Sequence, residues 1–406
     1  MAHLAVLSYH TSPLAQPGTG DGGGMNVYVR EISSHLARLG HDVDVYTRRD
    51  NTYVSDVVDV EPGFRVHHIA AGPFHELARE ETPFYVDEFA AGVAEHFRVH
   101  GVPSAIHAHY WLSALAGHSL KHEFDIPLIT TFHTLERVKA GTFEAESTER
   151  ALQEERIIGC CDAVLASCDV ESEQIISLYG ADQQRVHVVP LGVEHAFFAP
   201  GHRPQARRAL GLATGGPLVL FVGRLQALKG VDLALEAFIS LRHSQPEARM
   251  AIVGGPSGPQ GRETLDALHQ RVVEAGVIGS VTFVAPQSHQ MLSTWFRAAD
   301  VTLVPSRSES FGLVALESSA CGTPLVASRV GGLTTLVVSE HNGLLLESRD
   351  PEEWAKAIEW LLDESRSTTL STNAVLLAAN YTWRAAAQRV AALMSELASC
   401  ALVPCP

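Results

Sequence analysis

Two cations and two carboxylates in the second half of the chain have the types and spacing to hold a sugar nucleotide. Arg224 and Lys229 lie five residues apart, directly after the apolar run 218–222. On a loop that leaves a strand, two such side chains can converge on a diphosphate; taken alone, they are more often two solvated charges. Glu309 and Glu317 follow along the chain, eight residues apart.

A helix is predicted to begin near Phe311, between the two glutamates. Its free N–H groups and the positive end of its dipole would face a phosphate or a sugar. Both carboxylates could then accept hydrogen bonds from the hydroxyl groups of a ligand that lies along the helix start. For Glu317, a paired and half-buried helix carboxylate with a purely structural role stays an alternative.

A glycine-rich segment at 18–24 stands between the apolar run 4–7 and a helical pattern that begins at Met25. Consecutive glycines let the backbone turn tightly and bring its N–H groups against a bound group, with a helix N-terminus behind them. A flexible loop without a ligand is the alternative, because the spacing of the dinucleotide fingerprint is absent. That absence also counts against a nicotinamide-dependent oxidoreductase.

Short apolar runs alternate with amphipathic stretches along the whole chain, which predicts α/β architecture with parallel sheets. The simplest arrangement is two doubly wound domains facing across a cleft, with ligands at the carboxyl ends of the strands. The predicted boundaries are an acceptor-binding domain at 1–195, a linker at 196–214, a donor-binding domain at 215–375, and a C-terminal helix at 376–406 that packs back toward the first domain.

Composition excludes several classes of protein. The 406 residues are 46% hydrophobic and 19% charged, which suits large folded cores. Thirty Lys and Arg against 46 Asp and Glu give a net charge of −16, which argues against nucleic acid or an anionic membrane as the main partner. No signal peptide, no run long enough to span a bilayer and no C-x-x-C motif are visible, so we expect a cytoplasmic protein with reduced cysteines and no disulfide framework.

Taken together, the cation pair and the Glu309-x7-Glu317 pattern about 80 residues later resemble the retaining GT-B glycosyltransferases of family four. The resemblance covers essentially the whole chain. The string at 10–29 is similar to the D-inositol 3-phosphate glycosyltransferases of mycothiol biosynthesis. That resemblance implies two Rossmann-like domains and transfer of N-acetylglucosamine from UDP-GlcNAc to 1D-myo-inositol 3-phosphate, with retention and release of UDP.

The resemblance also assigns residues to the donor. Those matching donor-binding positions are Gln16, Pro17, Gly24, Arg224, Lys229, Gln287, Glu309 and Glu317. The two cations would clamp the diphosphate, Glu317 would bind the ribose hydroxyls and Glu309 the donor sugar. Gln287 occupies the uracil-contacting position, where the family often has arginine.

The acceptor residues come from the N-terminal half. Those matching the inositol-contacting segment are His10, Asp21, Gly22, Gly23, Gly24, Met25 and Asn26. The acceptor phosphate would be held by Arg79, Tyr110, Thr134 and Arg150. Arg79 stands where the family has lysine, so the charge is kept while the donor geometry changes.

For catalysis, the resemblance implies attack by the acceptor hydroxyl on the face from which UDP leaves, with His133, Arg224, Lys229 and Glu309 as the catalytic set. His133 would help to orient the donor sugar; a core histidine at a strand end is its alternative. No catalytic metal is required. A structural magnesium would be held by main-chain carbonyls at Phe296, Arg297, Ala299 and Thr323.

Other functions stay open at this stage. One is a family-four transferase with another acceptor, such as a sucrose-phosphate-synthase-like or aminocyclitol enzyme, since the donor motifs are shared. Another is a non-catalytic sugar-binding protein, against which the intact set of cations and glutamates counts. Formation of a homodimer is also left open.

Overall fold

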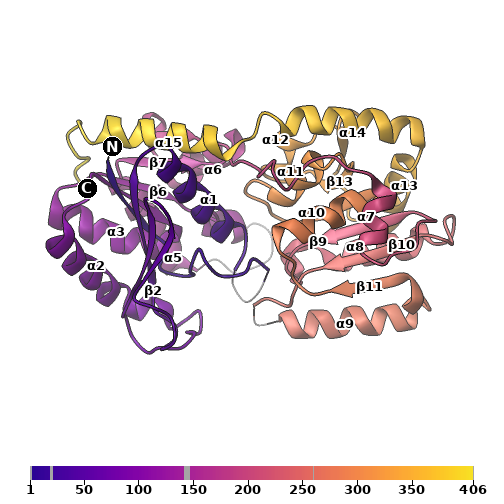
Figure 1. Ribbon diagram of the computed structural model, residues 1–406, viewed down its shortest axis with the longest axis horizontal. Helices are drawn as coiled ribbons and strands as arrows, with labels where there is room; N and C mark the ends of the chain where they lie inside the picture. The colour runs from indigo at the N-terminus through magenta and orange to yellow at the C-terminus, as the bar shows by residue number, and fades with distance from the viewer. Residues whose placement is uncertain (1, 19–21, 141–146, 259, 406) are drawn as a thin grey trace. The chain divides into compact units, whose positions relative to one another are not determined.

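The computed structural model describes residues 2–18, 22–140, 147–258 and 260–405. The chain divides into two compact units. The first unit contains Met1–Ala15, Gly24–Pro190 and Trp383–Pro406, and the second contains Gln16–Gly23 and Leu191–Thr382. In Figure 1 the first unit carries the indigo and purple elements together with the yellow C-terminal helix.

The first unit is built on an eight-stranded sheet with the order β3-β4-β2-β1-β5-β6-β7-β8. Its pairs are parallel except β3 with β4, which are antiparallel. The strands are β1 (His3–Leu7), β2 (Asp42–Arg48), β3 (Val57–Glu61), β4 (Phe64–Ile69), β5 (Ala105–His109), β6 (Leu128–Thr131), β7 (Ala163–Ala166) and β8 (Val186–Val188). The central strands β5, β6 and β7 are buried throughout, as expected for parallel strands covered on both faces.

Helices cover this sheet and make the first core. They are α1 (Gly24–Arg38), α2 (Val86–His100), α3 (Tyr110–Phe124), α4 (Glu136–Ala140), α5 (Thr148–Cys160), α6 (Asp169–Tyr179) and α15 (Trp383–Leu397). The last of these packs on α1 (Figure 1). The Tyr28 and Trp383 rings lie 5.8 Å apart there. The C-terminal helix therefore belongs to the first unit, although it follows the second unit in sequence.

The second unit is built on a six-stranded, all-parallel sheet with the order β11-β10-β9-β12-β13-β14. The strands are β9 (Leu218–Val222), β10 (Arg249–Val253), β11 (Val281–Val284), β12 (Val301–Val304), β13 (Leu325–Ser328) and β14 (Gly343–Leu346). The helices are α7 (Arg203–Ala209), α8 (Val231–Leu241), α9 (Gly261–Glu274), α10 (His289–Ala298), α11 (Leu313–Ala320), α12 (Leu333–Leu336), α13 (Pro351–Leu361) and α14 (Glu364–Ala378).

In each sheet the strand order reverses at one point, and ligands of such folds bind at the carboxyl ends of the strands there. The reversal lies between β1 and β5 in the first unit and between β9 and β12 in the second. The predicted α/β class with two doubly wound sheets is confirmed. The strand order also shows where ligand-binding residues should be sought in each unit.

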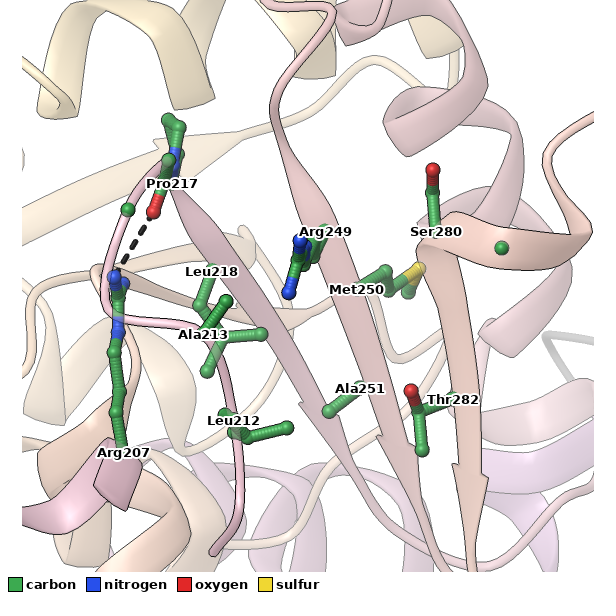
Figure 2. A pocket seen from close by; sticks show the side chains of 13 residues that line it. Arg207, Leu212, Ala213, Pro217, Leu218, Arg249, Met250, Ala251, Ser280 and Thr282 are labelled. Carbon is green, nitrogen blue, oxygen red and sulfur yellow. Dashed lines mark hydrogen bonds between the residues drawn. The ribbon is translucent and has the colours of Figure 1, made fainter.

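The segment 196–214 differs from the predicted linker, because it contains α7 and is part of the second unit. The buried Arg207 guanidinium donates hydrogen bonds to the carbonyls of Ala298 at 3.0 Å and Gly216 at 2.9 Å, and forms an ion pair with Asp300. Figure 2 shows this arginine beside a pocket at the amino ends of β9 and β10. That pocket lies at the opposite edge of the sheet from the predicted donor residues.

The cysteines also differ from the expectation of no disulfide. Cys160 and Cys405 form a disulfide across 245 residues of sequence. The spacing of cysteines does not reveal such a pair, because it depends on where the C-terminal segment docks in the fold. In the part of the chain that the structure describes, no helix is both long and apolar enough to cross a membrane.

Candidate active site

The loops after β9 and β12 bring a predicted cation and a predicted carboxylate into direct contact. Lys229 ends a short 3-10 turn after β9, and Glu309 lies in the loop between β12 and α11. The Lys229 Nζ is 2.7 Å from the Glu309 Oε2, and the Ser306 hydroxyl donates to the same oxygen at 3.1 Å. The two predicted donor residues therefore form one partly exposed ion pair at the strand-order reversal.

Two glycines, Gly331 and Gly332, pack against the backbone of Glu309. The Gly332 N–H donates to the Glu309 carbonyl at 3.0 Å. Gly331 has φ +46°, and a Cβ added there would lie 1.8 Å from the Glu309 carbonyl oxygen. Glycine at 331 is required by both the backbone conformation and this close approach.

Glu317 lies in the second turn of α11, which begins at Leu313 rather than near Phe311. Its side chain is buried, with 6% of the residue exposed, and burial raises the pKa of its carboxyl to about 8. Within the described residues, its carboxylate makes no ion pair or hydrogen bond. The residue is buried but its carboxylate oxygens are not fully enclosed, so the hydrogen-bond donors that a carboxylate requires can come from water or from a ligand. The paired structural role therefore lacks the partner that it requires.

The segment 16–23 belongs to the second unit, together with Arg224. A Cβ added to Gly23 would lie 3.6 Å from the Arg224 Nε, and one added to Gly18 would lie 3.2 Å from the Pro286 Cβ. Arg224 also donates a hydrogen bond to the Ser257 hydroxyl at 3.4 Å. The predicted donor residues Gln16 and Pro17 are thus in a segment that packs beside Arg224, the arginine predicted to clamp the diphosphate.

Four more predicted residues can be placed, three of them in or directly after this segment. Gly22 is buried and accepts a hydrogen bond from the Gly18 N–H at 2.9 Å, which closes the loop. Gly24 and Met25 open α1. Asp21 lies outside the described residues. The Gln287 amide donates to the Ala285 carbonyl at 2.8 Å, so its side chain folds back on its own backbone.

In the first unit, the residues after β1, β5 and β6 form the corresponding edge. The His10 and Tyr110 rings lie 5.3 Å apart, and the Asn26 amide donates to the Thr11 hydroxyl at 2.8 Å. Tyr110 and His133 have φ of +74° and +62°, a conformation that non-glycine residues rarely adopt. Such backbone conformations concentrate at functional sites.

Three of the four predicted phosphate-binding residues lie together. The Arg150 guanidinium is 4.9 Å from the centre of the Tyr110 ring, and donates to the Thr134 carbonyl at 2.9 Å and to its hydroxyl at 3.4 Å. Arg79 is exposed, and among the described residues its side chain has no recorded contact with the other three. The structure therefore forms this cluster without Arg79.

Two buried carboxylates that the sequence reasoning missed accompany Arg150, which is itself only 4% exposed. Its Nε donates to the Glu154 Oε1 at 2.8 Å, and its Nη1 lies 3.1 Å from the Glu136 Oε2. The four-residue spacing of Arg150 and Glu154 on one helix was the available signal. With two carboxylates around one guanidinium, this group carries no surplus positive charge of its own.

Histidines cluster behind the same edge. The His109 Nδ1 lies 3.0 Å from the His133 Nε2, and Tyr28 packs against both rings. Burial lowers the pKa of His133 to about 3. The imidazole is therefore neutral at physiological pH, which suits a residue that orients a ligand by hydrogen bonding and does not store a proton.

The segments predicted to hold a structural magnesium meet at the end of α10. The Thr323 hydroxyl donates to the Phe296 carbonyl at 2.7 Å. Carbonyl oxygens at a helix C-terminus carry partial negative charge, so the location suits a cation. The Phe296 oxygen also accepts from the Ala299 N–H at 3.1 Å, so a metal there would replace one of these hydrogen bonds.

Two Rossmann-like units with these residues at their strand-order reversals define a GT-B glycosyltransferase, a hexosyl-transferring enzyme. The model for glycosyl transferases group 1 matches residues 202–395, and the model for the glycosyl transferase 4-like domain matches residues 23–192.

Curated relatives agree over nearly the whole chain. It is 44% identical over 399 residues to the D-inositol 3-phosphate glycosyltransferase of Xylanimonas cellulosilytica, covering 95% of this chain and 94% of the relative. It is 42% identical over 404 residues to D-inositol 3-phosphate glycosyltransferase 2 of Catenulispora acidiphila, covering 97% and 94%. The chain belongs to the D-inositol 3-phosphate glycosyltransferase family.

Solved structures share the fold. A sucrose-phosphate synthase from Thermosynechococcus elongatus is 31% identical, with a TM-score of 0.90 over 98% of this chain and 99% of that one. Anabaena HepE, solved in complex with UDP and glucose, is 19% identical, with a TM-score of 0.79 over 98% and 100%.

Proposed function

We propose that the chain transfers N-acetylglucosamine from UDP-GlcNAc to 1D-myo-inositol 3-phosphate with retention and releases UDP. The observation that carries the acceptor is identity of 44% to a D-inositol 3-phosphate glycosyltransferase over 95% of the chain. For the donor, the support is the Lys229–Glu309 pair and the buried carboxylate of Glu317 eight residues further along the chain, on a fold shared with a protein solved with UDP.

In this proposal the residues of the second unit stabilise the leaving diphosphate. Negative charge builds on the β-phosphate as the bond to the sugar breaks, and preorganised cations lower the energy of that state. Arg224 and Lys229 supply the cations. Because Lys229 is already held by Glu309, it needs little reorganisation to meet a diphosphate, and Glu309 can turn toward the hydroxyls of the donor sugar.

The proton of the attacking hydroxyl passes to the departing phosphate oxygen, so no separate base is needed. His133, with a pKa of about 3, is too weak a base to compete for this proton at neutral pH. Its proposed role is to orient the donor sugar. A magnesium ion held by the carbonyls at the end of α10 would brace that helix end, and no part of the transfer depends on it.

On the acceptor side, Tyr110, Thr134 and Arg150 supply two hydroxyls and a guanidinium, which suit a phosphate oxyanion. The two carboxylates on Arg150 offset its charge, so the proposal requires a second cation. Arg79 is the residue that the family resemblance assigns to this task. Its exposed side chain leaves it available to reach a phosphate once an acceptor is bound.

A sucrose-phosphate-synthase-like acceptor is the second candidate, because such an enzyme shares 31% of the sequence and the fold over 98% of the chain. The second candidate would have a hexose phosphate as acceptor, where the first has a cyclitol phosphate.

The proposal is tested by incubating the full chain with UDP-GlcNAc and inositol 3-phosphate and following the anomeric proton by NMR. We expect one product with the α-configuration of the donor and one UDP per product. A β-configured product would contradict retention. Product from UDP-glucose but not from UDP-GlcNAc would contradict the donor assignment.

A further inference from the structure

Three metal-ligand side chains that the transferase chemistry does not use, those of His118, His122 and Cys405, meet at the far end of α3 in the first unit, and a fourth is joined to them by a disulfide. His118 and His122 lie four residues apart on this helix, so their rings share one face. The Cys405 Sγ is 3.2 Å from the His118 Nε2 and 3.0 Å from the His122 Nε2. Cys160, at the end of α5, is joined to Cys405 by the disulfide.

The spacing of these atoms is close to that of ligands around one ion. One ligand atom each from His118, His122 and Cys405 lies within 4.8 Å of the others. With bonds of about 2.3 Å to sulfur and about 2.0 Å to nitrogen, tetrahedral zinc places such atoms about 3.5 Å apart. Two histidines and two cysteines are also a ligand set that zinc commonly uses.

A buried ion pair holds both cysteine segments in place independently of the disulfide. The Lys121 Nζ lies 2.9 Å from the Asp162 carboxylate and donates to the carbonyls of Cys160 at 2.6 Å and Val403 at 3.0 Å. Asp162 in turn accepts a hydrogen bond from the Val403 N–H at 2.8 Å. When the disulfide is broken, these contacts therefore keep the Cys405 sulfur beside the histidines and the Cys160 segment beside Cys405.

We propose that the reduced chain binds one zinc ion through His118, His122, Cys160 and Cys405, and that oxidation to the disulfide excludes the metal. A low-molecular-weight thiol is the reductant: two thiol molecules form one external disulfide and leave two protein thiols. Zinc then replaces the two thiol protons, which pass to solvent, and the two thiolates neutralise the charge of the ion. The disulfide cannot act in this way, because the thiolate is the form that binds metals.

The test uses the full chain, reduced without oxygen, freed of reductant and titrated with Co²⁺ and then Zn²⁺. We expect one Co²⁺ per chain with the absorption of a tetrahedral thiolate complex, its displacement by Zn²⁺, and about two protons released per zinc. The oxidised chain should show none of these signals. Equal binding by the oxidised and reduced chains would overturn the proposal.

Matched variants locate the site. Cys405→Ser should weaken Zn²⁺ binding by at least about 100-fold, whereas Cys400→Ser, which removes an exposed free cysteine five residues earlier, should leave it unchanged. His122→Gln alters an exposed side chain that folding does not require, and it should also weaken binding. The site is refuted if Cys405→Ser and His122→Gln bind like the parent chain, or if Cys400→Ser binds as poorly as they do.

Discussion

Lys229 and Glu309 are 80 residues apart in sequence, and their side chains form an ion pair of 2.7 Å at adjacent strand ends. The pair brings a cation and a carboxylate to the same strand ends before any ligand arrives. In the proposed reaction, each partner then has its own target, the diphosphate for the lysine and the sugar hydroxyls for the glutamate. Preorganisation of this kind is what makes charged groups effective in a transition state.

Replacing Arg224 or Lys229 by alanine should reduce turnover by about 10²–10³-fold, because each removes one group that stabilises charge on the leaving diphosphate. Both residues lie on loops, so thermal unfolding should change little. Lys356→Ala, at an exposed position on α13, is the control and should retain full turnover. Parent-like turnover in both loop variants would refute the diphosphate clamp.

Glu317→Gln should weaken UDP binding in the absence of acceptor by about 1.5–3 kcal/mol, the usual cost of losing a charged hydrogen-bond partner. Calorimetry with UDP measures this directly. Unchanged affinity would favour a purely structural carboxylate.

The pH dependence of UDP binding provides a second test of the role of Glu317. Its carboxyl has a pKa of about 8 in the free chain, and ribose hydroxyls bind the deprotonated form better. UDP binding should therefore lower this pKa, so the affinity should rise as the pH increases toward about 8. The same titration of Glu317→Gln corrects for the protonation of UDP itself and should lack this rise. If both proteins show the same pH profile, Glu317 does not contact the ligand as a carboxylate.

Gly331→Ala should lower turnover, because the added Cβ would lie 1.8 Å from the Glu309 carbonyl oxygen and displace that residue. Gly276→Ala is the matched control: its φ of +68° is also left-handed, but nothing lies within 4 Å of the added atom. Gly276→Ala should lose about 1–2 kcal/mol of stability from the backbone conformation alone. Gly331→Ala should lose more, because the backbone around Glu309 must also shift. Equal turnover in the two variants would show that Glu309 is not held by this contact.

Replacing the two arginines predicted to bind the acceptor, Arg150 and Arg79, should have different effects on stability. Arg150→Ala leaves Glu136 and Glu154 buried without their cation, and should destabilise the chain by about 3–5 kcal/mol in chemical unfolding. Arg79→Ala should leave stability unchanged, since this side chain is exposed, while reducing the use of inositol 3-phosphate relative to free inositol. An unchanged ratio of the two acceptors in Arg79→Ala would remove Arg79 from the phosphate site.

Local sequence patterns predicted the fold class, the family resemblance predicted the enzyme class, and both are confirmed. Buried parallel strands are recognisable because they read as continuous apolar runs, as at β9 and β12. The short helix within segment 196–214 was not predicted, because the prolines and glycines of this segment are typical of a loop. Arg207 holds this helix in place by a hydrogen bond to the carbonyl of Ala298, which is distant in sequence.

What sequence reasoning missed are partners that only the fold brings together. Two ion pairs show this most clearly. Glu136 pairs with Arg150 on another helix, and Lys229 pairs with Glu309 in the loop after another strand. The disulfide depends in the same way on the docking of the C-terminal segment. The ligand roles of the site residues stay predictions, because they depend on molecules that the chain must bind.

The proposed transfer is tested most directly by a competition between acceptors. The full chain is given UDP-GlcNAc with equal concentrations of inositol 3-phosphate, free inositol and a hexose phosphate, and the early products are identified by mass spectrometry. We expect N-acetylglucosaminyl inositol phosphate to dominate, because the Tyr110–Thr134–Arg150 cluster with Arg79 favours a phosphorylated acceptor. A dominant product on the hexose phosphate, or equal use of inositol and its phosphate, would contradict the proposed acceptor.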